Sequence, residues 1–187
     1  RIFFHQLCEC LSFDIFRNNG PFAVNHCNFQ YTGNAKSGFF NSRLVQCLIE
    51  HIRLGIAVVM DIVHSHSVDN EAEGLGLFDG TETLYFYDGW QGHHPAWGSR
   101  CFDYGKDETK YFLLSNCKYW MEEYHIDGFR FDGVTSMLYW DHGLEKAFVG
   151  YDNYFNQGVD ENAVTYLALA NMLIREMNPE AFTIAED

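Results

Sequence analysis

The chain has 187 residues, and its 47% hydrophobic and 17% aromatic content indicates a globular protein with a core, not a disordered one. Its formal net charge of −14 argues against binding to nucleic acid or to an anionic membrane surface, so we expect neither partner. A neutral ligand with many hydroxyl groups suits an acidic, aromatic-rich chain better, because sugar faces stack on aromatic rings and carboxylates bind hydroxyls.

The sequence predicts no membrane span and no disulfide framework. It has no run of about 18 apolar residues, and it begins RIFFHQLCEC without a recognisable signal peptide. Six cysteines are scattered without a CxxC pair, which favours a reducing cytoplasmic location, or a plastid if the source is a plant. Cys8, Cys10 and Cys27, beside His5 and His26, match no zinc-finger spacing, so we expect no metal there.

The regular pattern begins at residue 43. The segment 43–54 predicts a helix that ends at Gly55, and 56–63 (IAVVMDIV) is a continuous β-branched run typical of a strand buried on both faces. Residues 67–103 contain many glycines and aromatics and predict an irregular excursion. The apolar residues of the first helix at helical spacing are Leu44, Leu48, Ile49 and Ile52.

The second half alternates helices and strands. Asp107 is expected to cap a helix over 107–125, a strand follows over 125–131, and Asp160 opens a helix over 160–177. The chain then ends in a short strand, FTIAED. The predicted apolar stripe of the 107–125 helix is Tyr111, Leu114, Cys117, Met121 and Tyr124.

This order predicts an α/β fold with parallel strands and right-handed crossovers. A doubly wound sheet and a (β/α)8 barrel both fit it, and periodicity alone does not choose between them.

Each predicted strand ends in an acid. Asp61 follows IAVVM, Asp132 follows GFRF and Glu186 follows FTIA. Because the C-terminal ends of parallel strands form one rim, we expect the three carboxylates to converge there, with His66 in the loop at the same rim.

Two carboxyl groups with opposite pKa shifts are what glycosidic cleavage requires. Arg130, two residues before Asp132 on the same face, is expected to lower the pKa of Asp132 and keep it ionised. Burial is expected to keep the proton on Glu186. Gly128 and Gly133 would leave room for a sugar ring. A retaining mechanism would place the two carboxyls about 5–5.5 Å apart.

At these residues the sequence resembles the α-amylase superfamily. MDIVHSH (60–66), DGFRFDGVTSM (127–137) and TIAED (183–187) are similar to its first three conserved regions. The sequence most resembles the eukaryotic-type 1,4-α-glucan branching enzymes, for example in the segments GHHPAWGSRCFDYG and QGVDENAVTYLALAN. The resemblance covers about residues 44–187, and several long motifs in the same order make it specific.

The resemblance implies a TIM (β/α)8 barrel catalytic domain of which the chain carries a part, about strands 3 to 5, over residues 43–187 with an insertion at 67–103. It implies a retaining transglycosylation without a cofactor or metal. The substrate would be an α-1,4-glucan (glycogen, amylose or amylopectin), which is cleaved and re-attached through an α-1,6 linkage.

The resemblance also implies roles for individual residues. Asp132 matches the family nucleophile and Glu186 the proton donor, while Asp61, His66 and Arg130 match residues that bind the substrate. In the insertion we favour packing or loop anchoring over glucan contact for Trp90, His93, His94 and Trp97.

Two departures from the family pattern stand out. Residues 1–42 do not match, so the sugar-stacking tyrosine of the family is not assigned to Tyr31. The His-Asp pair of the fourth conserved region is not matched either, and we expect residues 1–187 alone to be inactive. Two alternatives stay open: another hydrolase or debranching enzyme of the superfamily, or a truncated glucan-binding product. The HSH at 64–66 has too few ligands for a metal.

Overall fold

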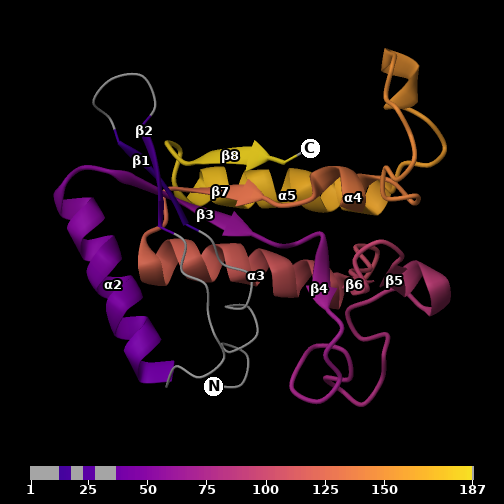
Figure 1. The fold of residues 1–187 in the computed structure, drawn as a ribbon, viewed down its shortest axis with the longest axis horizontal. Helices are drawn as coiled ribbons and strands as arrows, with labels where there is room; N and C mark the ends of the chain where they lie inside the picture. The colour runs from indigo at the N-terminus through magenta and orange to yellow at the C-terminus, as the bar shows by residue number, and fades with distance from the viewer. Residues whose placement is uncertain (1–12, 18–22, 28–36, 187) are drawn as a thin grey trace.

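The computed structural model describes the backbone of residues 13–17, 23–27 and 37–186, and the side chains of residues 45–186. The cysteine and histidine side chains near the N-terminus and Tyr31 lie outside these described residues. The centre of the molecule is a five-stranded sheet in the order β2-β1-β3-β7-β8 (Figure 1).

Three parallel strands form the half of the sheet that was predicted. They are β3 (Ala57–Ile62), β7 (Gly128–Phe131) and β8 (Phe182–Ala185). In β3, Val58, Val59 and Met60 are all at most 2% exposed, which confirms a strand buried on both faces. The alternation of strands and helices in the sequence therefore predicted these elements correctly.

The other half of the sheet was not predicted. Strands β1 (Phe13–Arg17) and β2 (Ala23–Cys27) pair as an antiparallel hairpin, and β1 also pairs antiparallel with β3. Neither FDIFR nor AVNHC has the continuous apolar run or the clear alternation that predicts a strand. The sheet is therefore mixed, where an all-parallel sheet was expected.

Helix α2 (Ser37–Arg53) begins earlier than predicted but ends where the sequence indicated. Gly55, with φ of 65°, adopts the left-handed conformation that ends a helix. Its N–H donates to the carbonyl of Ile52 at 3.1 Å, and the N–H of Ile56 donates to that of His51 at 3.0 Å. These two bonds form a Schellman motif, which turns the chain into β3.

The predicted apolar stripe of α2 only partly faces the core. Leu48 is 5% exposed, whereas Ile49 is 47% and Ile52 is 50% exposed. Helical spacing identifies a face of the helix but not what covers that face.

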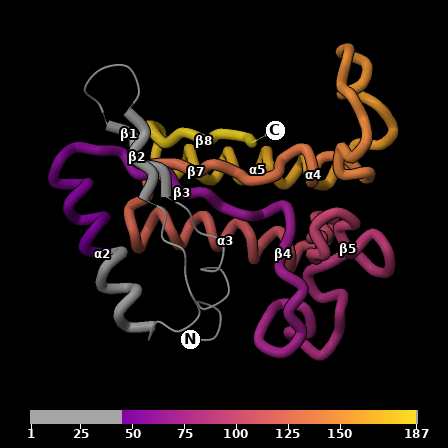
Figure 2. Tube along the Cα trace, in the orientation of Figure 1, coloured from indigo at the N-terminus to yellow at the C-terminus, as the bar shows by residue number. Residues whose placement is uncertain are grey.

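Helices α3 (Asp107–Tyr124) and α5 (Glu161–Met177) pack against each other and against one face of the parallel strands (Figure 2). Phe129 and Phe131 of β7 enter the core they share. The buried side of α3 includes Leu113, Cys117 and Trp120, whereas Tyr111, predicted to be buried, is 70% exposed.

The two predicted helix caps differ in outcome. The Asp160 carboxylate accepts the N–H groups of Asn162 and Ala163 and caps α5, as expected. Asp107, by contrast, is the first residue inside α3, and Lys106 holds the cap position without a side-chain cap hydrogen bond. Asp107 in the first turn still complements the helix dipole.

The 67–103 insertion is more regular than its sequence indicated. It contains most of a small antiparallel sheet in the order β4-β6-β5, with strands of three, three and two residues. Strands this short fall below the length at which alternation is visible. The remaining elements are β4 (His66–Val68), η1 (Gly89–Gly92), β5 (His93–His94), β6 (Ser99–Cys101), α4 (Val134–Leu138) and η2 (Tyr151–Asn153).

Buried Arg100 of β6 fixes the insertion. Its Nη2 donates to the carbonyl of Glu82 at 2.8 Å, and its Nη1 lies 3.7 Å from Asp69. The guanidinium also sits over the ring of Phe86, 5.2 Å from its centre. Among the residues that the structure describes, no helix has the length and apolar character needed to span a membrane.

Candidate active site

Strand register brings the predicted site residues to one face of the sheet. Asp61 of β3 pairs with Arg130 of β7, which in turn pairs with Ile184 of β8. Phe129 and Phe131 point to the helices, so Arg130 between them points to the opposite face. Asp132 and Glu186 lie two residues beyond Arg130 and Ile184 and share that face.

The hydrogen-bond ladder continues past the strand ends and holds the two acids in place. The N–H of Asp132 donates to the carbonyl of Ile62, and the N–H of Glu186 donates to that of Phe131, both at 3.0 Å. The acids therefore lie at the C-terminal ends of neighbouring parallel strands, the edge where α/β proteins place their active sites.

Arg130 joins the acids electrostatically. Its Nη1 contacts Asp61 and its Nη2 contacts Glu186, while Asp132 lies 3.7 Å from Nη1. The Arg130 side chain is 25% exposed. One guanidinium thus lies among three carboxyl groups, which explains a charged residue in an otherwise apolar strand.

The side chains of Asp132 and Glu186 interact with each other, and a hydrogen bond between them contributes to the pKa shifts of both. Such an interaction fits the short separation of a retaining pair, about 5–5.5 Å, better than the about 6.5–9.5 Å of inverting enzymes. Glu186 Oε2 also accepts the N–H of Gly133 at 3.2 Å. Gly133, with φ of 62°, has the left-handed backbone that makes this approach possible.

The pKa directions are the reverse of those predicted. Burial, and then the hydrogen bond and negative charge of Glu186, raise the pKa of Asp132 to about 7. Its hydrogen bond to Asp132 and its contacts with Gly133 and Arg130 lower the pKa of Glu186. The prediction failed because burial of Asp132 and its interaction with Glu186 outweigh the attraction of Arg130, whose Nη1 lies 3.7 Å away. The raised pKa of Asp132 and the lowered pKa of Glu186 favour Asp132 as the site of a proton held between the two carboxyls.

His66 lies in a neighbouring cluster in the small sheet. Its Nδ1 lies 2.9 Å from Ser65 Oγ, and its ring centre lies 4.7 Å from that of Trp97. Burial lowers the pKa of His66, so the ring is neutral at neutral pH. Ser65 lies between this cluster and the acids. Its Oγ is so close to Gly133, the residue after Asp132, that a Cβ added to Gly133 would lie only 3.0 Å from it.

A buried polar network that the sequence did not reveal supports this segment. The His64 ring hydrogen-bonds the Tyr166 hydroxyl through Nδ1 and Asn116 Oδ1 through Nε2 at 3.0 Å. Burial lowers the pKa of His64 to about 4, and the Tyr104 hydroxyl donates to its carbonyl at 2.7 Å. The HSH motif thus holds one structural histidine. The only signal for it was a histidine directly after a buried strand.

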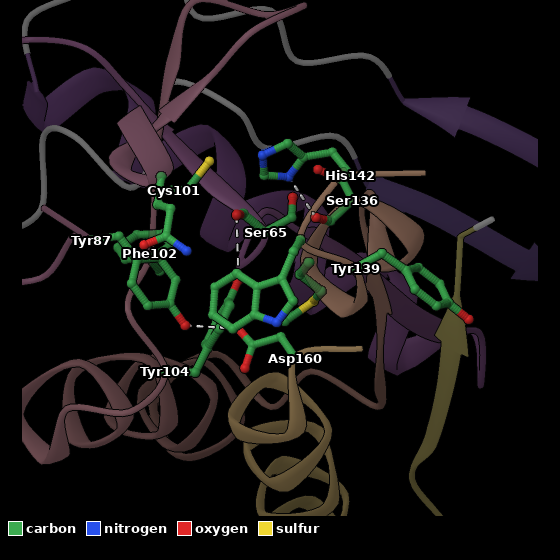
Figure 3. A pocket seen from close by; sticks show the side chains of 12 residues that line it. Ser65, Tyr87, Cys101, Phe102, Tyr104, Ser136, Tyr139, His142 and Asp160 are labelled. Carbon is green, nitrogen blue, oxygen red and sulfur yellow. Dashed lines mark hydrogen bonds between the residues drawn. The ribbon is translucent and has the colours of Figure 1, made fainter. Parts of the chain in front are cut away.

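A small pocket lies between the insertion and the segment that joins α4 to α5 (Figure 3). Tyr87, Asp160, Ser136 and His142 are among the residues that line it, and the Tyr87 hydroxyl donates to Asp160 at 2.7 Å. The cavity of about 20 Å³ has room for about one water molecule. It is too small for a sugar ring and is not the candidate site.

The two glycines of DGFRFDG, both predicted to leave room for a sugar ring, lie in different environments. A Cβ on Gly128 would lie 2.4 Å from the carbonyl oxygen of Phe182, so Gly128 is needed for the close approach of β8. Asp127 accepts the N–H of Val58 at 2.7 Å and ties the start of β7 to β3. Only Gly133 borders the acids.

The sequence is similar to a set of curated proteins over most of its length. It is 53% identical over 135 residues to the 1,4-alpha-glucan-branching enzyme of Aspergillus oryzae, which is 72% of this chain and 20% of that protein. The enzyme of the same name from Equus caballus matches at 53% identity, over 72% of this chain and 19% of its own. An Arabidopsis thaliana relative, 1,4-alpha-glucan-branching enzyme 2-2, chloroplastic/amyloplastic, also matches at 53% identity. The chain spans about a fifth of the length of these relatives, and no protein-family model matches it.

Solved structures share the fold at lower identity. The catalytic module of the multi-modular glycogen-degrading pneumococcal virulence factor SpuA matches with a TM-score of 0.54 and 20% identity, over 78% of this chain and 16% of that one. A maltogenic alpha-amylase, AmyB from Thermotoga neapolitana, matches with a TM-score of 0.52 and 17% identity, over 79% of this chain and 28% of that one. The chain therefore contains part of the fold of these catalytic modules.

Proposed function

Because this chain belongs, over the 135 matched residues, to the family of 1,4-alpha-glucan-branching enzymes, we propose that its protein cleaves an α-1,4-glucan and re-attaches the released chain through an α-1,6 linkage. The substrate is glycogen, amylose or amylopectin. The observation that carries the proposal is the position of Asp132 and Glu186 at the C-terminal ends of neighbouring parallel strands, on either side of Arg130.

The proposed reaction has two displacements. Asp132, as a carboxylate, attacks C1 of a glucose unit while Glu186 gives its proton to the leaving oxygen, and a covalent glucosyl ester forms on Asp132. The 6-hydroxyl of a second glucan segment then attacks C1, Glu186 takes its proton, and the Asp132 carboxylate leaves. Two inversions at C1 retain its configuration.

The shared proton must change places before the first displacement. The higher pKa of Asp132 favours the proton there, whereas the reaction needs it on Glu186. The hydrogen bond between the two carboxyls makes this transfer short. A glycosidic oxygen beside Glu186 favours the proton on that side, because the protonated carboxyl can then donate to it.

Asp61, Arg130 and His66 serve the substrate in this proposal. Arg130 fixes the positions of Asp61 and Glu186 through two different nitrogens. Pre-positioned charges of this kind stabilise a developing oxocarbenium ion without moving during the reaction. His66, neutral through burial, is suited to hydrogen-bond a sugar hydroxyl.

The fold assignment within this proposal is a (β/α)8 barrel in which β3, β7 and β8 are the third, fourth and fifth strands. Residues 43–187 then belong to the catalytic domain, with 67–103 as the insertion after the third strand. The proposed location is the cytoplasm, or the plastid in a plant.

A linkage assay on the full-length protein tests this function. Incubation with amylose is expected to produce α-1,6 linkages, measured by proton NMR, without a matching gain in reducing ends. Asp132→Asn abolishes the product, whereas Asp107→Asn, at a carboxylate that is 74% exposed on α3, leaves it unchanged. New reducing ends without α-1,6 linkages would assign the protein to the hydrolases instead.

A further inference from the structure

Trp97 is held by the small sheet of the insertion. It lies in the turn between β5 and β6. There the backbone N–H of Trp97 donates to His94 Nδ1 at 3.2 Å, and the backbone N–H of Gly98 donates to the His94 carbonyl at 3.0 Å. Because β6 also pairs with β4, the strand of His66, the turn has a fixed position relative to that residue. The backbone of Trp97 is therefore ordered before any ligand arrives.

One face of the indole is covered and the side chain still reaches solvent. The rings of Trp97 and His94 stack with centres 3.9 Å apart and planes 6° apart, and His94 is 1% exposed. Trp97 itself remains 49% exposed. Burial lowers the pKa of His94 to about 4, so the ring beneath the indole is uncharged at neutral pH.

The indole borders the acid pair at Gly133. A Cβ built on Gly133 would lie 3.4 Å from Trp97 Cη2. Gly133 follows Asp132 directly, and its N–H donates to Glu186. The six-membered end of the indole thus lies beside the backbone of Gly133, next to Asp132 in sequence and hydrogen-bonded to Glu186. An exposed aromatic surface beside carboxylates is the combination that binds sugars, because the C–H face of a glucose ring is apolar and its hydroxyls are polar.

We propose that Trp97 is a sugar-binding residue on whose exposed surface a glucose ring of the bound α-glucan stacks while the neighbouring linkage lies at Asp132 and Glu186. The inference rests on the proposed function and adds to it a binding role for the insertion. It revises the expectation from sequence that Trp97 only packs or anchors the loop. His94 remains a packing residue, since it is buried under the indole.

The test measures binding separately from turnover in the full-length protein. In an Asp132→Asn background, the Kd for maltohexaose is determined by titration calorimetry. Trp97→Ala is expected to weaken binding about tenfold, or about 1.4 kcal/mol, because the stacked aromatic surface is lost. Trp97→Phe and Trp97→Tyr retain a flat ring and are expected to restore the affinity to within about threefold. Trp90→Ala removes another tryptophan of the insertion, one that is 76% exposed, and should leave Kd unchanged.

In the active protein, Trp97→Ala should raise KM for amylose about tenfold with a smaller change in kcat. Unchanged Kd and KM in Trp97→Ala would overturn the inference. So would a loss of binding that neither Phe nor Tyr restores and that comes with a lower Tm, since that pattern describes a structural residue. If the unsubstituted protein forms no α-1,6 linkages, the proposed function fails, and the Kd series still decides whether Trp97 binds a glucan.

Discussion

Arg130 reaches three carboxyl groups with one guanidinium, and its shape is what makes this possible. Nη1 contacts Asp61 and Nη2 contacts Glu186, with Asp132 3.7 Å from Nη1. A lysine has one ammonium on a flexible stem and cannot contact two carboxylates from two fixed nitrogens. The acids therefore depend on the planar fork as well as on the positive charge.

Arg130→Lys is expected to lower kcat for branching about 10²-fold in the full-length protein, because small displacements of reacting groups reduce rates by about that factor. The measurement is initial α-1,6 linkage formation at saturating amylose. Arg175→Lys, at an exposed position in the last turn of α5, is the matched control and should retain full activity. Activity of Arg130→Lys within about twofold of the parent would contradict this account of the fork.

Asp132 lowers the stability of the fold at neutral pH. Its pKa is raised from 3.8 to about 7, so between these pH values the native state holds a proton that the unfolded state has released. Stability therefore falls as pH rises through this window and stays lower above about pH 7. A buried functional carboxyl of this kind lowers the stability of the fold, as expected where activity requires a destabilised active site.

Asp132→Asn should consequently abolish activity and raise Tm. The gain in Tm is expected to be full above about pH 7 and to vanish below about pH 4, because there both states of the parent are protonated at this position. Thermal unfolding of parent and variant at pH 4, 6 and 8 provides the comparison. A variant that is less stable than the parent at pH 8 would show that Asp132 is stabilised as a carboxylate.

At the scale of elements, Asp160 connects the insertion to the helix that leads into β8. Its Oδ1 accepts the N–H groups of Asn162 and Ala163, and its Oδ2 accepts the Tyr87 hydroxyl at 2.7 Å (Figure 3). The side chain is 2% exposed. One carboxylate thus caps α5 and holds the insertion against it.

Asp160→Ala should lower the free energy of unfolding by about 2–3 kcal/mol, the combined effect of a lost cap and a lost hydrogen bond to a charged group. Tyr87→Phe removes only the hydrogen bond and is expected to cost about 1–1.5 kcal/mol. Both are measured by urea unfolding of the full-length protein, with Asp152→Ala at an exposed position of η2 as the control. Equal stability of Tyr87→Phe and the parent would mean that the insertion is held by other contacts.

The elements that the sequence predicted correctly are those with a strong local signal. β3 has a continuous β-branched run, α5 begins at a capping aspartate, and α2 ends at a glycine. β5 and β6 have two and three residues and gave no periodic signal, so the insertion was taken to be irregular.

The candidate site was predictable in position but not in protonation. An acid at the end of each strand is visible in the sequence, and parallel pairing brings such residues together. Which carboxyl holds the proton depends on how far each one is buried and on how the two acids contact each other. That is decided by side-chain conformation, which sequence spacing does not determine.

At the scale of the whole molecule, the three parallel strands are neighbours in the sheet in the order in which they occur along the chain. The sheet order is β3-β7-β8, and the helices between these strands, α3 and α5, pack side by side. This order occurs in a (β/α)8 barrel and also in one half of a doubly wound sheet. The antiparallel β1 beside β3 departs from an all-parallel barrel, in a region where the sequence also departs from the family pattern.

The central claim is that Asp132 attacks the sugar and Glu186 supplies the proton, and trapping the covalent intermediate tests it most directly. An α-glucosyl fluoride donor needs no acid for departure of its fluoride, so Glu186→Gln in the full-length protein should form the ester on Asp132 and release it slowly. Peptide mass spectrometry after acid quench is expected to find one glucosyl group on the peptide that contains Asp132, and none in Asp132→Asn with Glu186→Gln. A glucosyl group on Asp61 or another carboxylate would contradict the assignment.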